Sequence, residues 1–324
     1  MKFQTDYEIA EYLRNKQVQK LINRKCLEPI LSYEQYSSAV KTAKAKTEHK
    51  LFTNCYLMKH EIQRLIDLGS FYQIIYENDN CNGVTFVGDE RSHYRVFVYV
   101  DPNRDFGIPR LDRSALIETV YLDGRESEQQ KNFESRLKKA DFHFYMKYHQ
   151  IDCTPRLEPK EFWRKYHAID KFMKVDGVRV CIPNDEQLCQ FEEIYREEID
   201  IYTQTYCSMD ERRAQREAGY LYCLSDRQDQ VYAISMSGRI YGGAIAVKRE
   251  YVSNMYGTAL MFGAVKGFYE DMPDDMYQRT EYMRPKAFGW IATMNSASRR
   301  VHGSLKMLNT GKAMNQFIRA GYVY

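Results

Sequence analysis

The sequence predicts a mixed α/β (α+β) fold built as two related domains. Three observations support this prediction. The chain has 324 residues, a length that suits two domains of ordinary size. Its hydrophobic pattern alternates along the chain between the 3.6-residue period of amphipathic helices and the two-residue period of strands. Finally, both halves of the chain end in the same order of predicted elements.

The composition is that of a globular protein. Hydrophobic residues form 44% of the chain and charged residues 28%, with a formal net charge of +3, which excludes disorder, collagen and coiled coil. The longest apolar runs, such as the one around 244–247, are too short to span a bilayer, and residues 1–6 do not resemble a signal peptide. The cysteines and histidines show no metal-ligand spacing. We therefore expect a cytoplasmic protein with buried thiols, no metal and no membrane partner.

The first half alternates helices and strands. Patterns with the helical period predict helices over 7–24, over 57–68 up to Gly69, and after Asp123-Gly124 through Phe133 and Leu137. Runs of β-branched and aromatic residues predict strands over 71–76, 94–100, 116–122 and 142–148. Two prolines within 153–159 then predict a boundary, because proline disfavours both helix and sheet. The predicted domains are 1–155 and 156–324, joined by a connector helix over 160–173.

The second half repeats this alternation. The pattern predicts a strand over 178–182, an acidic helix through Leu188 and Phe191, a hairpin of 231–236 with 240–247, a strand over 288–293, a helix through Val301 and a short closing element. The segment 252–286 fits both helix and strand. Residues 116–148 and 288–317 each read as strand, tight turn, amphipathic helix, apolar stop and strand, so we interpret them as a repeat.

Charge is distributed unevenly along the second half. Residues 185–217 include ten acidic and four basic residues, whereas residues from Arg279 onward include eight basic residues and one acidic residue. The two segments are either solvated helix faces of opposite sign or the two walls of a bipolar cleft. The basic segment lacks the clustered bases with interleaved aromatics typical of a nucleic-acid-binding face.

Three segments of the second half resemble the GNAT superfamily of acyltransferases. Val178–Asp185 is similar to the family's opening strand and helix, and Val231–Val247 is similar to its central hairpin. Asn295–Met307 is similar to its final motif, N-x-x-A-x-x-L-Y-x-x-L-G-F. Lys306 stands where this motif has glycine, which leaves the turn geometry open. The resemblance implies two tandem GNAT-like domains, each with a mixed, mostly antiparallel central sheet flanked by helices.

The resemblance implies an N-acyltransferase, first of all an N-acetyltransferase, in which an amine attacks an acyl thioester directly. Acetyl-CoA or another acyl-CoA would be the co-substrate. His302 takes the place of the tyrosine that usually protonates the leaving thiolate, and an imidazole can do the same. Asn295 would bind the acyl or pantetheine groups, Ser298 would also bind the co-substrate, and Arg299 and Arg300 would meet its phosphates. Each has a structural alternative: a helix N-cap for Asn295, a half-exposed helix residue for His302, and a solvated face for the arginines.

The family's pyrophosphate loop, Q/R-x-x-G-x-G/A, has one approximate counterpart here. Asn254 takes the first position, and Gly257 and Ala259 take the small positions, with a helix expected to follow. A rival interpretation makes 255–268 a long strand and begins a helix at Pro273. That layout resembles the Fem-type aminoacyl transferases, and it removes the loop.

The catalytic domain is expected to be 156–324, with 1–155 as a degenerate partner that shapes the substrate groove. Glu193, Glu197 or a tyrosine would bind and deprotonate the amine of a small molecule or peptide. An aminoacyl-tRNA or a carrier-protein thioester is an alternative donor, and a non-catalytic binding module is the second alternative function. The oligomeric state stays open.

Overall fold

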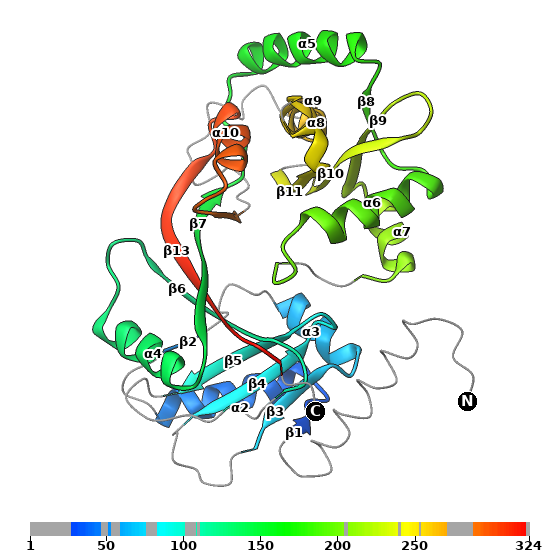
Figure 1. Cartoon of the computed structure of the whole chain (residues 1–324). Coiled ribbons are helices and arrows are strands. Elements are labelled where there is room, and N and C mark those ends of the chain that lie inside the picture. Colours follow the sequence, from blue (N-terminus) through cyan, green and yellow to red (C-terminus); the bar gives the residue numbers. More distant parts are fainter. Residues whose placement is uncertain are drawn as a thin grey trace, which may run out of the picture. The chain divides into compact units, whose positions relative to one another are not determined.

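The computed structural model describes residues 27–46, 51–52, 59–75, 83–100, 108, 111–203, 207–238, 241–252, 254–270 and 288–321 (Figure 1). The predicted helix over 7–24 lies outside them. The chain divides into two compact units. The N-terminal unit comprises Met1–Lys147 together with Ala313–Tyr324, and the C-terminal unit comprises Tyr148–Lys312. Unlike the predicted domains 1–155 and 156–324, these units assign the end of the chain to the N-terminal one.

The N-terminal unit is a mixed sheet flanked by helices. Its elements are β1 (Leu27–Pro29), α2 (Tyr33–Lys46), β2 (Leu51–Phe52), α3 (Lys59–Asp67), β3 (Phe71–Ile74), β4 (Val84–Asp89), β5 (Tyr94–Val100), β6 (Ala115–Leu122) and α4 (Glu128–Lys139). Two further strands, β7 (His143–Asp152) and β13 (Leu308–Arg319), run from one unit into the other. The strand order is β1-β3-β4-β5-β6-β13-β7, and β2 pairs with β5. The helices and strands predicted between 57 and 148 are confirmed.

Strand β5 shows why the sequence forms this sheet. Its side chains alternate between two hydrophobic clusters, one on each face. Val96 and Val98 belong to the cluster that includes Phe133 of α4, whereas Phe97 and Tyr99 belong to the cluster under α2 and α3. Because both faces are covered, the strand is an almost continuous apolar run.

The C-terminal unit holds a second sheet. Its elements are α5 (Pro159–Val175), β8 (Arg179–Cys181), α6 (Asp185–Glu198), α7 (Met209–Glu217), β9 (Leu221–Ser225), β10 (Val231–Gly238), β11 (Tyr241–Val247), the short helix η1 (Arg249–Tyr251), α8 (Tyr256–Ala264), α9 (Lys266–Glu270), β12 (Phe288–Ala292) and α10 (Ser296–Ser304). The sheet has the order β11-β10-β9-β8 and is antiparallel throughout. Strand β12 pairs with β7, also antiparallel. The predicted strands, acidic helix and hairpin are confirmed.

Helices α6 and α8 cover opposite faces of the four-stranded sheet. Leu188 and Phe191 of α6 pack in one cluster, and Ala259 and Leu260 of α8 pack in another. Alternate residues of β9 face these two clusters. The rival interpretation of 255–268 as a strand is wrong, and Pro273 lies outside the described residues. Because α8 is buried on nearly all sides, its sequence shows neither the helical nor the strand period.

Helix α5, predicted as a connector, is also part of the core of the C-terminal unit. Phe162 is fully buried and stacks on Tyr269 of α9 with ring centroids 3.7 Å apart. It also stacks on Phe262 of α8 at 5.4 Å. Among the described residues, no helix combines the length and the apolar character needed to cross a membrane.

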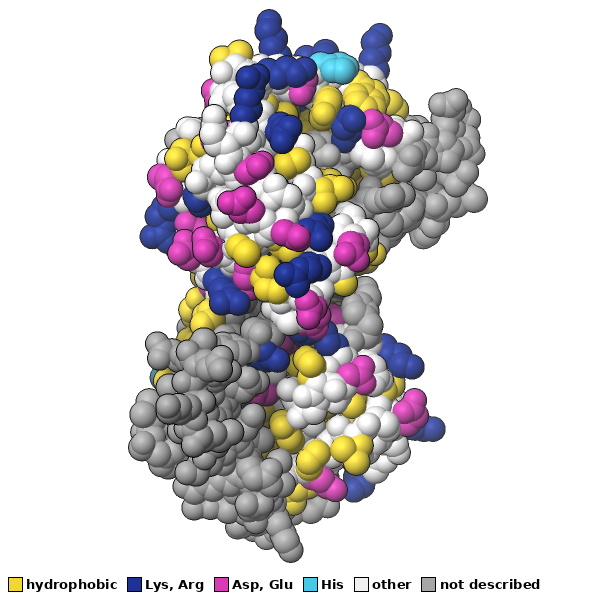
Figure 2. All heavy atoms as spheres, turned by 90° about the vertical axis from the view of Figure 1, so that its right-hand side faces the viewer, with side chains coloured by type: hydrophobic (Ala, Val, Ile, Leu, Met, Phe, Trp, Pro, Cys, Tyr) yellow, Lys and Arg dark blue, Asp and Glu magenta, His cyan; other side chains and the backbone are white. Residues whose placement is uncertain are grey.

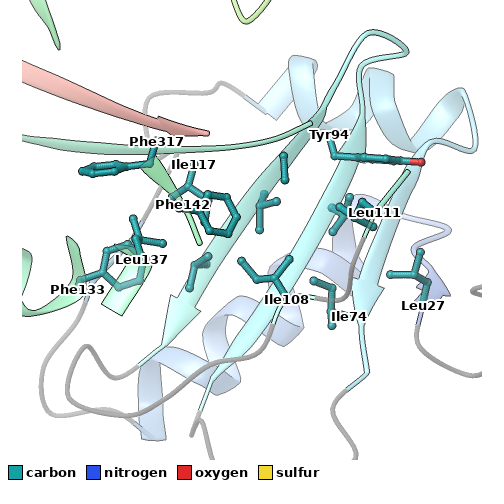
Figure 3. Packing of buried hydrophobic residues seen from close by; sticks show 14 residues of the cluster. Leu27, Ile74, Tyr94, Ile108, Leu111, Ile117, Phe133, Leu137, Phe142 and Phe317 are labelled. Atoms are coloured by element: carbon teal, nitrogen blue, oxygen red, sulfur yellow. The ribbon is translucent and has the colours of Figure 1, made fainter. Parts of the chain in front are cut away.

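The two halves of the chain each supply a strand to the other unit. In the N-terminal unit β13 lies between β6 and β7, and Phe317 of this strand lies beside Ile117 (Figure 3). In the C-terminal unit β7 lies between β13 and β12, where Thr310 donates a hydrogen bond to Gln150 at 2.9 Å. The predicted short closing element is therefore wrong. The polar start of β13 and Gly311, at φ +79°, hide the alternation that indicates a strand.

The predicted repeat is visible in the backbone. Helices α4 and α10 both end in a turn with a left-handed residue, Asp141 at φ 65° and Lys306 at φ 56°. After α4, the N–H of Phe142 donates to the carbonyl of Leu137. After α10, the N–H of Met307 donates to the carbonyl of His302, which likewise lies five positions earlier. This pattern is a Schellman cap in both places. The turn thus forms although Lys306 replaces the glycine of the motif.

Candidate functional site

The candidate site lies at two sheet edges of the C-terminal unit, where no further strand pairs among the described residues. Strand β11 ends the four-stranded sheet and β12 ends the other one, and within the described residues the two do not pair with each other. Helices α8 and α10 meet beside β11. A Cβ atom built on Gly257 of α8 would lie 3.4 Å from Val247 of β11 and 3.8 Å from Val301 of α10. The start of α8, the end of β11 and the middle of α10 therefore converge.

The start of α8 presents backbone donors at this point. Met255 has left-handed backbone (φ 56°), and the helix begins directly after it. The first turn of any helix leaves N–H groups without intrahelical partners and is the positive end of the helix dipole. Asn254 and Gly257 lie at this end, whereas Ala259 is fully buried and packs into the core. Such a helix start is suited to binding an anionic group.

The position of α8 is fixed by close contact with β8. A Cβ atom on Gly263 would lie 2.7 Å from a methyl carbon of Val180, which is closer than real Cβ contacts. Glycine is therefore required here, because a side chain would push the helix away from the sheet.

The start of α10 holds four of the predicted residues. Asn295 is the N-cap, and its side-chain oxygen accepts a hydrogen bond from the Ser298 N–H at 2.8 Å. Arg299 and Arg300 are exposed, and the Arg299 guanidinium donates to the carbonyl of Thr293. Asn295 thus has the structural role of a cap, and the arginines present positive charge at the surface of the same turn.

His302 lies one turn later and is buried. Its Nδ1 lies 2.7 Å from the backbone carbonyl oxygen of Ser298. A carbonyl only accepts hydrogen bonds, so this contact places the proton of the neutral ring on Nδ1. Burial lowers the pKa of His302, and the bond to Ser298 opposes this shift. The imidazole is therefore neutral at pH 7, with Nε2 as a proton acceptor.

The structure separates Glu193 and Glu197 from α8. Both are exposed on α6, which covers the other face of the sheet. Their neighbour Glu192 is buried instead, and its carboxylate accepts a 2.8 Å hydrogen bond from the fully buried Arg212 of α7. The sequence contains the signal for this pair, because Glu192 lies four residues after the buried Leu188 on the same helix face.

All four arginines of the acidic segment form ion pairs with acidic residues of the same segment. Asp185 pairs with Arg216 at 2.6 Å, and Asp210 pairs with Arg213 at 2.7 Å. Figure 2 shows acidic and basic side chains interspersed on the face that it draws. This arrangement favours solvated helix faces over an acidic wall of a cleft.

The corresponding edge in the N-terminal unit is covered. Strands β5 and β6 are parallel and pair only at their starts. Tyr94 lies opposite Ala115, and the residue after each of them forms the second pair. Strand β4 occupies the other edge of β5 along its length. Beyond the pair with β6, β2 takes the free edge, with Phe52 opposite Tyr99. The gap between the diverging parallel strands thus contains a segment of the chain itself.

No protein-family model matches the sequence, and no curated protein matches it either. Solved structures are similar. One is a fungal GCN5-related glucosamine N-acetyltransferase region of a multi-domain GH3 β-N-acetylglucosaminidase, with TM-score 0.52 and 10% identity over 90% of this chain and 38% of that chain.

Two others are a GNAT-family acetyltransferase from Colwellia psychrerythraea (TM-score 0.43, 9% identity, 90% of this chain and 99% of that chain) and a tandem GNAT protein from the clavulanic acid biosynthesis pathway (TM-score 0.41, 10% identity, 78% and 83%). The likeness to the fungal region shows that the chain has the GNAT fold, as the sequence resemblance implied.

Proposed function

We propose that this chain is an N-acyltransferase, first of all an N-acetyltransferase, whose C-terminal unit binds acyl-CoA between β11 and β12. The observation that supports the proposal is that β11 and β12 are edge strands among the described residues and that β11 lies beside the start of α8. A free edge offers N–H and C=O groups in a row, which suits the amides of a pantetheine arm. The residues present therefore fit this co-substrate.

The anionic part of acyl-CoA would bind at the two helix starts. Backbone N–H groups at 255–257 and the side chains of Ser298, Arg299 and Arg300 provide donors and positive charge there. The N–H of Asn254 already donates to the carbonyl of Tyr251 at 3.0 Å. The thioester would supply the acyl group, and the amine would attack its carbonyl carbon. The acceptor class, a small-molecule or peptide amine, stays as predicted from the sequence.

His302 is the proposed proton-transfer group. Because its ring is neutral with Nδ1–H bound to Ser298, Nε2 first accepts a proton and can then return it to the leaving thiolate. Asn295 has a supporting role, since its side chain holds the turn that positions Ser298. Glu193 and Glu197 remain predictions for the amine side, and their exposure on α6 gives them no added support.

The N-terminal unit is proposed to bind no donor. Strand β2 occupies the edge of β5 that corresponds to the open edge of β11. A donor arm would have to displace this strand before it could pair. We therefore expect one donor site per chain.

Turnover by the full-length chain tests the proposed function. We expect acetyl-CoA to raise the melting temperature and to release free thiol in the presence of a panel of amines. Ligand at about 100 times its Kd stabilises a protein by about 2.7 kcal/mol, which a melting scan resolves. If product forms only from aminoacyl-tRNA or from a carrier-protein thioester, that compound is the donor instead of acyl-CoA. If no donor raises the melting temperature, the chain is a non-catalytic binding module.

The role of His302 is tested by His302→Ala, with His143→Ala as the matched control at an exposed position of β7. Loss of general acid–base catalysis lowers kcat by roughly a hundredfold or more, without a comparable rise in KM. A His302→Ala rate within about threefold of the parent would exclude this residue from proton transfer.

A further inference from the structure

Two cysteines of the C-terminal unit lie directly opposite each other on neighbouring strands. Cys181 of β8 pairs in register with Cys223 of β9, and the strands are antiparallel. Their Sγ atoms are 3.5 Å apart. Side chains opposite each other in an antiparallel pair have Cβ atoms about 4.5–5.5 Å apart, and a disulfide needs about 3.5–4.5 Å. Bringing the sulfur atoms to the S–S bond length of about 2.05 Å therefore needs rotation of both side chains and an approach of the strands by about 1 Å.

The two thiols differ in environment. Cys181 is half-buried and Cys223 is fully buried. Hydrogen bonds from the Cys223 thiol and, at 3.3 Å, from the Ser225 hydroxyl lower the pKa of Cys181 to about 6. The same interaction with Cys181, together with burial, raises the pKa of Cys223. At neutral pH the half-buried Cys181 is therefore a thiolate, and the fully buried Cys223 keeps its proton.

We propose that Cys181 and Cys223 form a peroxide-sensitive pair that closes to a reversible disulfide between β8 and β9. The Cys181 thiolate attacks one oxygen of hydrogen peroxide, so that an S–O bond forms, the O–O bond breaks, and the other oxygen leaves as water after protonation. The Cys223 sulfur then attacks the sulfenic sulfur; the S–S bond forms, the S–O bond breaks and a second water leaves. Two thiols lose two electrons, and a dithiol reductant reverses the change.

The start of α6 would respond to this change. Ser225, which contacts Cys181, accepts a hydrogen bond from Gln187 at 3.0 Å. Gln187 belongs to the capping box of α6, where its side chain accepts from the N–H of Asn184. Closing the disulfide removes the contact between Cys181 and Ser225. Oxidation of the pair is therefore expected to weaken the hydrogen bonding that holds the start of α6 to β9. This inference does not depend on the proposed acyl transfer.

Peptide mapping of the full-length chain tests the proposal. The chain is treated with hydrogen peroxide at a few equivalents, quenched with an alkylating agent and digested. We expect a peptide pair linked through Cys181 and Cys223, abolished by Cys181→Ser, and reduced by dithiothreitol. In Cys223→Ser we expect dimedone to trap a sulfenic acid at Cys181. The matched control Cys189→Ser, at an exposed position of α6, should leave the linked pair unchanged.

The alkylation rate of the unmodified parent provides a test that needs no substitution. The alkylation rate of Cys181 should level off above about pH 7, whereas the rate of an ordinary cysteine rises up to about pH 8.5. Complete alkylation of Cys181 and Cys223 after peroxide, or a linked pair that involves other cysteines, would overturn the proposal.

Discussion

Lys306 shows how a single residue can depart from a family motif and keep its backbone. The residue sits in the left-handed region at φ 56°, where a side chain costs about 1–2 kcal/mol and glycine costs nothing. Its ammonium group pairs with Glu161 of α5 at 2.7 Å, but this exposed pair is worth little. The Schellman cap of α10 therefore contains strain that its salt bridge does not offset.

At this position we expect Lys306→Gly to stabilise the fold. Lys306→Ala is the matched variant, because both substitutions remove the pair with Glu161 and only glycine relieves the left-handed strain. The glycine variant should be more stable than the alanine variant by about 1 kcal/mol in urea unfolding. Equal stability of the two variants would show that the turn is unstrained.

His93 makes stability depend on pH. Its side chain is fully buried, and burial followed by the charges of Arg95 and Arg113 lowers its pKa to about 3. The pKa in the unfolded chain is about 6.5, so the unfolded state binds the proton first as the pH falls. The stabilisation is complete above pH 6.5 and is lost progressively as the pH falls toward 3. Buried His302 acts in the same direction.

From pH 7 to pH 5, the free energy of unfolding should fall by about 2 kcal/mol less in His93→Gln than in the parent. Urea unfolding at the two pH values measures this difference. A His93→Gln profile parallel to that of the parent would show that folding does not lower the pKa of His93.

At the scale of elements, the contact between α8 and β8 positions the candidate site. Gly263 allows α8 to approach Val180 more closely than any side chain would permit. The helix start at Gly257 and the open edge of β11 depend on this approach, since α8 packs along β10 and β11. A change at Gly263 should therefore act on both stability and the site.

For Gly263→Ala we expect a loss of about 1–3 kcal/mol of unfolding free energy, the range for an overpacked core. Val180→Ala in the same chain should recover part of the loss, because it removes the methyl groups that collide. Gly267→Ala is the control, since a Cβ there meets nothing within 4 Å, and its effect should stay within about 0.5 kcal/mol. Additive losses in the double variant would contradict the close-packing account.

The elements that could be predicted from the sequence are those whose local signals agree. The β-branched run at 94–100 and the capping box of Asn184 with Gln187 specify β5 and the start of α6 without outside help. Helix α8 could not be decided, because a helix buried on nearly all sides has no amphipathic period. For the site, the sequence indicated Asn295–Met307 correctly as a helix and turn. The sequence also contains the signal that Glu192 is buried, because this residue shares the buried face of α6 with Leu188.

At the scale of the whole molecule, the chain is two units that exchange strands. Strand β13 completes the sheet of the N-terminal unit between β6 and β7, and β7 completes that of the C-terminal unit between β13 and β12. No local pattern encodes such pairing, which joins residues about half the chain apart and is set by the fold as a whole. The repeat of strand, helix and strand is nevertheless what makes the exchange possible, because both units end in the same elements.

The exchange predicts that a residue near the C-terminus stabilises the N-terminal unit. Phe317 is buried in the cluster of that unit, so we expect Phe317→Ala to cost about 3–5 kcal/mol. Hydrogen exchange should show faster opening of β4, β5 and β6. Leu308→Ala, at an exposed position of the same strand, should leave these amides unchanged. Faster exchange confined to the C-terminal unit would contradict the strand assignment.

Binding stoichiometry tests the central claim, that the C-terminal unit alone binds acyl-CoA. In titration calorimetry of the full-length chain, we expect one acetyl-CoA per chain. We expect Arg300→Glu to weaken binding roughly tenfold, since a hydrogen bond to a charged group is worth about 1.5–3 kcal/mol. Lys171→Glu, the matched charge reversal at an exposed position of α5, should bind like the parent. Two molecules per chain, or none, would contradict the account.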